Sequence, residues 1–412
     1  MVMKRLIFLA VLAVLPIVSE GQQRLRDRDP LLEGAKKLAG DLQQASFHRG
    51  QFYLLSRFRI SDAGFTEGGF LPTGEQSGGI SLSVEAPHRL YYVPHKKTVF
   101  SAEFIPGYAF FNGGENQVNY LVRGDAHLLL NHVYLDFYGL RSDQIVAHVA
   151  DINRLATART DEVGVASEFK YSSRTSALVT LRANDITYPG NRFQPDPFPE
   201  SQVPVRILDR KEKNVRLSLV HKTFPRTSLF VSGEGSEYDF VNKAAYASRR
   251  SYFGGGLSYD GGRTQLRLEA GPMKLVFDDP SQRDYSGLTA QAQVSRGNGR
   301  WSYGANANRD LGFSVFRDNA YFVATSAGMN VDYIATRKLT LHARTALERD
   351  EYETPVFGRA RRDDIQFTSV GFDYGLRRIR LGADVGWYER TSTAFGDEAS
   401  GIRYVLRLSL TP

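Results

Sequence analysis

The segment Gly297–Asn308, GNGRWSYGANAN, holds the two signals that decide the fold. Its first four residues form a short polar turn that contains glycine and arginine. From Trp301 onward, aromatic or small apolar residues at odd positions alternate with small or polar residues at even positions. Because successive side chains of a β-strand point to opposite faces, one face of this segment suits lipid and the other suits water.

The same combination recurs along the chain. Eight short, mostly basic turns are flanked by alternating segments: Pro94–Lys97, Gly139–Ser142, Ser172–Thr175, Thr223–Thr227, Asp260–Arg263, Gly297–Arg300, Ala335–Lys338 and Leu376–Arg378. A longer, less regular loop lies between consecutive turns. Short turns that alternate with long loops are typical of bacterial outer-membrane barrels. The sequence therefore predicts an all-β fold, a transmembrane antiparallel up-and-down β-barrel of about 18 strands, with a short N-terminal helix.

The first residues predict export from the cytoplasm. Lys4 and Arg5 precede the apolar run Leu6–Val18, and a cleavage site before Gln22 follows small residues. We expect a signal peptide at 1–21, a periplasmic segment at 22–49 and an outer-membrane barrel at 50–412. No later stretch reaches the 18 apolar residues of a transmembrane helix. A protein that spans the membrane without such helices must be a closed barrel.

Composition agrees with a barrel wall. Mean hydropathy is −0.33, as expected when only every second residue faces lipid. The absence of cysteine excludes a lipoprotein anchor, disulfides and a thiol metal site. The formal net charge of +7 is modest, and we expect no nucleic-acid partner. A soluble secreted β-protein is the competing interpretation of this composition.

One amphipathic helix is predicted ahead of the barrel. Asp29 is a good N-cap and Pro30 a good first helical residue. One face of the helix would carry Leu31, Ala35, Leu38 and Leu42. The helix could plug the lumen, lie at the periplasmic rim, contact a periplasmic partner or form a loosely attached tail.

Charged residues in the strands share the phase of the polar face. A charge on the lipid face would cost about 2–4 kcal/mol at mid-membrane, so these residues are predicted to face inward. The pore-lining candidates are Arg57, Arg59, Arg182, Arg216, Arg267, Arg380, Arg407, Glu269, Asp384 and Tyr388. Arginine can pair with a passing polyanion or with the acids of the wall itself. We expect wall pairing for most of them.

Motifs that carry chemistry are missing from the sequence. His127 and His132 are five residues apart and would point to opposite faces of one strand, and no H-x-H or H-E-x-x-H spacing occurs. There is no G-x-S-x-G elbow and no phosphate loop. We therefore predict no catalytic, cofactor-binding or metal-binding residues and no enzymatic activity. A Ser–His pair assembled from neighbouring strands is the alternative that spacing leaves open.

The longest predicted loop, Asn184–Lys213, contains five of the 16 prolines. Loops of this length in compact proteins are usually functional or disordered. This loop would either fold into the lumen and narrow it or lie on the outer surface.

Residues 50–412 resemble the putative β-barrel porin type 2 family in their strand rhythm, their basic turns and the alternating C-terminal segment Tyr404–Leu410. The resemblance implies an outer-membrane barrel, surrounded by outer-membrane lipid and folded by the barrel-assembly machinery. It also implies exopolysaccharide export together with a periplasmic export partner. We therefore expect an exit port for exopolysaccharide or another polar polymer. The alternatives are a passive diffusion porin for small polar solutes and an outer-membrane lipid-modifying enzyme.

Overall fold

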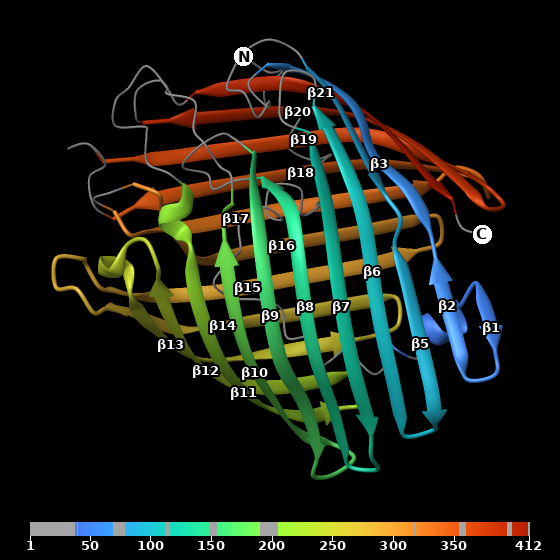
Figure 1. The fold of residues 1–412 in the computed structure, drawn as a ribbon, viewed down its shortest axis with the longest axis horizontal. Helices are drawn as coiled ribbons and strands as arrows, with labels where there is room; N and C mark the ends of the chain where they lie inside the picture. Colours follow the sequence, from blue (N-terminus) through green and yellow to red (C-terminus); the bar gives the residue numbers. More distant parts are fainter. Residues whose placement is uncertain are drawn as a thin grey trace.

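The computed structural model describes Leu38 and residues 40–68, 79–111, 116–147, 155–189, 205–316, 319–353, 360–393 and 398–410. These residues form one antiparallel sheet that curves round and closes on itself (Figure 1). No helix of the described residues is long and apolar enough to cross a membrane.

The sheet contains 21 β-segments. They are β1 (Phe47–Arg49), β2 (Phe52–Ser56), β3 (Phe58–Gly68), β4 (Gly79–Glu85), β5 (His88–His95), β6 (Thr98–Phe111), β7 (Gln117–Leu129), β8 (Val133–Ala147), β9 (Leu155–Lys170), β10 (Thr175–Thr187), β11 (Arg210–Phe224), β12 (Thr227–Phe240), β13 (Ser248–Asp260), β14 (Thr264–Phe277), β15 (Tyr285–Asn298), β16 (Trp301–Phe313), β17 (Tyr321–Ile334), β18 (Leu339–Tyr352), β19 (Arg362–Leu376), β20 (Ile379–Ser392) and β21 (Ala399–Leu410).

The wall has the predicted 18 strands. β2 and β3 together form the first wall strand, and β4 and β5 together form the second, because β2 pairs with β5 and β3 with β4. The sixteen segments from β6 to β21 supply the rest. Pairing of β3 with β21, from Phe58 opposite Leu410 to Gly68 opposite Gly401, closes the barrel. The segment β1 pairs with β2 beside this seam.

The two faces of the wall differ as the alternation predicts. On β11, Val215, Leu217 and Leu219 point outward and are about half exposed, whereas Arg216 and Ser218 point inward and are buried. In the membrane, lipid would cover these outward apolar side chains, as it covers the apolar face of each strand in a transmembrane barrel. The inward face therefore defines the lumen.

Short turns lie at one end of the barrel, which we call the short-turn end, and longer loops lie at the other, the loop end (Figure 1). Seven of the eight predicted turns connect consecutive strands. Gly299 at one of them has φ of 62°, a left-handed conformation that glycine adopts without strain. The first and last wall strands both have an end at the short-turn end, because Phe52 pairs near the turn after His95 and Leu410 pairs with Ile379.

The turn predicted at Gly139–Ser142 is wrong. These residues lie inside β8, where the Arg141 side chain forms an ion pair with Asp161 at 3.5 Å. The chain turns instead at 130–132, where the N–H of Leu130 donates to the carbonyl of Val133 at 2.8 Å. That turn has the sequence Leu-Asn-His and lacks glycine, proline, lysine and arginine, so it carries no strong local signal.

Most of the predicted N-terminal helix lies outside the described residues, as do the signal peptide and the start of the periplasmic segment. Its described end, Leu38 and residues 40–43, is helical. Leu38 is buried against Tyr91 and Val99 on the inward faces of β5 and β6. Asp41 accepts hydrogen bonds from Arg89 at 2.8 Å and from the Tyr91 hydroxyl at 2.6 Å. The end of the helix therefore lies inside the barrel near the short-turn end.

Single cysteines should label from opposite sides of the outer membrane when placed at Gly299 and at Asp279. Gly299 lies in the short turn between β15 and β16, and Asp279 in the longer loop between β14 and β15. Short turns of such barrels face the periplasm, so only Asp279→Cys should react with an impermeant reagent on intact cells. The native chain lacks cysteine and is the blank. Reaction of both variants on intact cells would contradict this topology.

Candidate functional site in the barrel lumen

A group of buried charges lies on the inward face of β11 to β16. We call Arg216, Glu234, Arg250, Glu269 and Asp310 the central ion cluster. The Arg216 guanidinium lies 3.1 Å from Glu234 and 2.8 Å from Glu269. The Arg250 side chain has no exposed surface, and it lies 3.5 Å from Glu234 and 3.8 Å from Asp310. Two arginines and three carboxylates thus form ion pairs with one another away from water.

Two predicted pore-lining residues belong to this cluster, and a third lies beside it. Arg216 and Glu269 are members, and the Arg267 guanidinium lies 3.6 Å from Glu269. Arg267 also lies over the ring of Phe230, 4.8 Å from its centroid. The Tyr252 hydroxyl donates to Glu269 at 3.1 Å. These arginines pair with the wall's own carboxylates.

A second charged group spans β18 to β21. The Arg407 guanidinium lies 2.7 Å from Asp384 and 3.5 Å from Asp373. His342 Nε2 lies 2.5 Å from the same Asp384 carboxylate. The structure thus brings together Asp384 and Arg407, two predicted pore-lining residues that are 23 positions apart in sequence, because they occupy inward positions on neighbouring strands.

The other predicted pore-lining residues lie apart from these groups. Arg59 forms an ion pair with Glu85 at 2.5 Å, Arg182 lies opposite Gly164 and Asn214, and Tyr388 is buried against Ile365 and Phe367. Arg57 is exposed at the break between β2 and β3, and Arg380 is exposed next to a short turn. A role of these ten residues in permeation stays a prediction.

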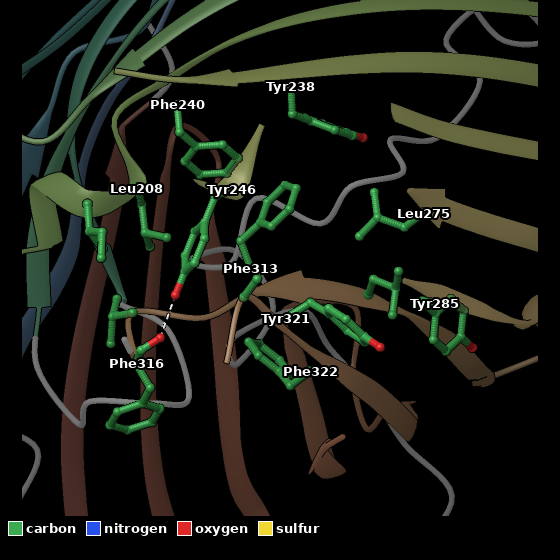
Figure 2. Packing of buried hydrophobic residues seen from close by; sticks show 14 of the residues in the cluster. Leu208, Tyr238, Phe240, Tyr246, Leu275, Tyr285, Phe313, Phe316, Tyr321 and Phe322 are labelled. Atoms are coloured by element: carbon green, nitrogen blue, oxygen red, sulfur yellow. Dashed lines mark hydrogen bonds between the residues drawn. The ribbon is translucent and has the colours of Figure 1, made fainter. Parts of the chain in front are cut away.

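Aromatic residues pack together inside the barrel near the loop end (Figure 2). We define the aromatic layer by Tyr238, Phe240, Tyr246, Phe313, Phe316, Tyr321, Phe322 and Tyr352. The Tyr246 side chain is fully buried, and its hydroxyl donates to the backbone carbonyls of Phe316 and Asn319 in the loop after β16. The Phe313 ring meets Phe240 edge-on, with centroids 4.8 Å apart. The layer therefore joins several loops into one packed unit inside the wall.

The loop after β10 contributes to the same packing. Its short 3-10 helix η2 (Val205–Leu208) buries Val205 and Leu208 in this hydrophobic cluster. At the start of the loop, the N–H of Tyr188 donates to Asp209 at 2.8 Å. Burial raises the pKa of the Tyr188 phenol. Four of the loop's five prolines lie outside the described residues, so constriction by that segment stays a prediction.

No sequence motif predicted the polar cluster that lies on β6, β7 and β8. The Ser101 hydroxyl donates to Asp125 at 2.9 Å and lies 3.4 Å from His127 Nε2. His127 Nδ1 lies 3.0 Å from Asp136. The ligand atoms of Asp125, His127 and Asp136 all lie within 4.8 Å of one another, close enough for a cation. Only strand register could have revealed this, since Ser101 pairs with Asp125 and His127 with Asp136 across strands.

Three observations argue against chemistry at this cluster. The Arg123 guanidinium lies 2.6 Å from Asp125 and 4.0 Å from Asp136, so both carboxylates already have a cationic partner. The Ser101 hydroxyl donates to Asp125 rather than to the imidazole, unlike the nucleophile of a Ser-His-Asp triad. The cluster also faces the lumen, whereas a lipid-modifying enzyme needs its nucleophile at the lipid interface.

The closed wall, the apolar outward face and the charged lumen define a β-barrel channel protein of the bacterial outer membrane. The family model described as Putative beta-barrel porin 2 matches residues 200–411, just over half of the chain. The chain belongs to this family. No curated protein sequence matches the chain.

Solved structures from Pseudomonas aeruginosa have the same fold. OpdK is 12% identical over 87% of this chain and 99% of its own, with a TM-score of 0.51. OpdK solved with vanillate is 13% identical over the same shares, with a TM-score of 0.52. OccK5 (OpdH) is 12% identical over 88% of this chain and 98% of its own, with a TM-score of 0.50. At these identities the similarity concerns the fold alone.

Proposed function

We propose that this barrel carries a polar carbohydrate polymer, such as an exopolysaccharide, out of the cell without chemistry of its own. The observation that carries the proposal is the presence of inward tyrosines at successive depths of the lumen. Tyr91 and Tyr134 lie near the short-turn end, Tyr138 and Tyr252 lie further along their strands, and Tyr238 lies in the aromatic layer.

Tyr138 is partly exposed to the lumen, whereas Tyr91, Tyr134, Tyr238 and Tyr252 are buried and would meet a sugar only after neighbouring side chains move. The Tyr138 hydroxyl donates to Glu162 at 2.7 Å, as the Tyr252 hydroxyl does to Glu269 at 3.1 Å. An aromatic ring offers an apolar face while its hydroxyl stays hydrogen-bonded. A sugar ring has apolar and polar faces of its own, so such a wall can guide a chain without binding it tightly. The aromatic layer packs inside the wall near the loop end, and we infer that export requires this layer to move aside.

Deleting the gene should abolish surface polysaccharide and leave polymer detectable inside the cell. Export without chemistry predicts that synthesis continues while release stops. The measurement is polysaccharide in the surface and intracellular fractions, and the complemented deletion strain is the control. Normal release from the deletion strain would contradict the export proposal.

The second candidate is a channel for small polar solutes. The aromatic layer favours it, because a packed layer obstructs a polymer more than a small molecule. OpdK, which shares the fold, was solved with vanillate, and this also favours a small solute. Under this alternative, liposomes that contain the native protein should swell in small sugars at a rate that falls with sugar size. Normal polysaccharide release together with reduced small-solute uptake in the deletion strain would favour this candidate.

A further inference from the structure

The charge on the eight short turns is almost entirely positive. Together they contain one acidic residue, Asp260, and ten basic residues: Lys96, Lys97, Arg174, Arg226, Arg263, Arg300, Arg337, Lys338, Arg377 and Arg378. We call this set the basic crown. All ten side chains are exposed, and none forms a salt bridge with another described residue. Every turn except 130–132 contributes at least one of them, so the crown surrounds the mouth of the barrel.

The fold does not require this charge. Turn geometry is set by residues such as Gly262 and Gly299, which have positive φ angles. Elsewhere in the described chain, basic residues lie beside acids: Arg283 shares a loop with Asp278 and Asp284, and the lumen arginines form ion pairs. Exposed charges of one sign repel each other and lower stability slightly. We therefore infer that this ring of excess positive charge at one mouth of the barrel binds a ligand.

Neighbouring turns are close enough for their fields to add. Two strands separate consecutive short turns, so the turns stand about 10 Å apart. This distance is close to the Debye length of about 8 Å at physiological ionic strength. The crown thus gives the mouth a continuous positive potential, which can raise the local concentration and association rate of an anion by about 10–10³-fold.

We propose that the basic crown captures an anionic polymer, a carbohydrate chain that bears carboxylates, at the short-turn mouth. This rests on the proposed export function and names its cargo as acidic. Exposed ion pairs contribute little one at a time, so a small monovalent anion gains little from the crown. A polymer can contact several turns at once, and its contacts add because they are linked. Seven of the ten cations are arginines, which bind carboxylates in a bidentate manner.

The crown also leads toward the lumen. Arg380 is exposed two residues beyond Arg378 and shares the inward phase of Asp384 on β20. Arg407 on the neighbouring strand keeps about 29% of its side chain exposed. A carboxylate chain that leaves the turns would therefore meet further guanidinium groups at the entrance.

The test uses the full-length barrel in nanodiscs of zwitterionic lipid, with fluorescent polygalacturonate as the probe and neutral dextran of equal length as its counterpart. Native protein should bind polygalacturonate, more weakly as salt rises, and should not bind dextran. The crown variant is Arg263→Gln, Arg300→Gln, Arg337→Gln, Lys338→Gln and Arg378→Gln. It should bind the probe about tenfold more weakly, with a shallower salt dependence.

A matched control removes the same charge at the loop end: Arg206→Gln, Lys211→Gln, Lys213→Gln, Arg249→Gln and Lys274→Gln, all exposed side chains. It should bind the probe like native protein, and heat-modifiable gel migration should show both variants folded. Equal loss in both variants, equal binding of dextran, or no binding by native protein would overturn the crown proposal. Binding of both proteins to anionic lipid vesicles is measured as well. If the crown variant loses vesicle binding but binds the polymer like native protein, the crown binds lipid and the proposal is overturned. None of these outcomes affects the deletion-strain test of export.

Discussion

Replacing Tyr246 with alanine should raise the ion conductance of the barrel several-fold. The Tyr246 ring is fully buried in the aromatic layer, edge-on to Phe240 with centroids 5.6 Å apart. Its hydroxyl holds the loop after β16 through the carbonyls of Phe316 and Asn319. Truncation of a buried aromatic residue to alanine costs about 3–5 kcal/mol of local stability, enough to populate conformations in which this loop leaves the lumen. Single-channel recording in planar bilayers measures the effect.

Two variants separate loss of the layer from a general effect of losing a ring. Phe253 points outward on β13 and is 65% exposed, so Phe253→Ala should leave conductance unchanged. Tyr246→Phe keeps the ring and leaves the two carbonyls without this donor, so its conductance should lie between those of native protein and Tyr246→Ala. If Tyr246→Ala conducts like the native protein, the aromatic layer is not the barrier.

The strands and turns of the wall could be predicted from the sequence because they depend on residues that are close together in the chain. Alternation with period two, as in Gly297–Asn308, and turns rich in glycine and arginine identified 18 strands. The same rules misplaced one turn, because Leu130–His132 has no glycine or proline while Gly139 lies inside a strand. The predicted number of strands was still correct, because the chain has a turn at 130–132 in place of the one predicted at Gly139–Ser142.

The contents of the lumen could not be predicted in the same way. Tyr246 and Phe316 come from different loops, and their contact depends on how those loops fold back into the barrel. Ser101, His127 and Asp136 meet because of strand register, which one sequence specifies only once turn lengths are known. The basic crown was visible as a repeated feature of the turns. The gathering of these basic residues around one mouth became evident only when the turns were placed together.

Replacing Arg250 with alanine should lower the free energy of unfolding of the barrel strongly. The Arg250 side chain is fully buried between Glu234 and Asp310. Removing one partner of a buried ion pair leaves the other charge uncompensated, which typically costs about 3–5 kcal/mol. The remaining cluster would hold three carboxylates against Arg216. Urea unfolding of the protein in lipid vesicles, followed by heat-modifiable gel migration, measures the difference.

Arg249, the preceding residue on β13, provides the matched control. Its side chain points outward, is 70% exposed and lies 3.9 Å from Asp278. Exposed ion pairs contribute about 0–1 kcal/mol, so Arg249→Ala should unfold close to the native midpoint. The two variants change the same residue type on the same strand and differ in the face that is altered. If they are equally stable, the charges of the central ion cluster are solvated in the folded protein. In that case the lumen at this depth is open to water, and the cluster lines a passage rather than bracing the wall.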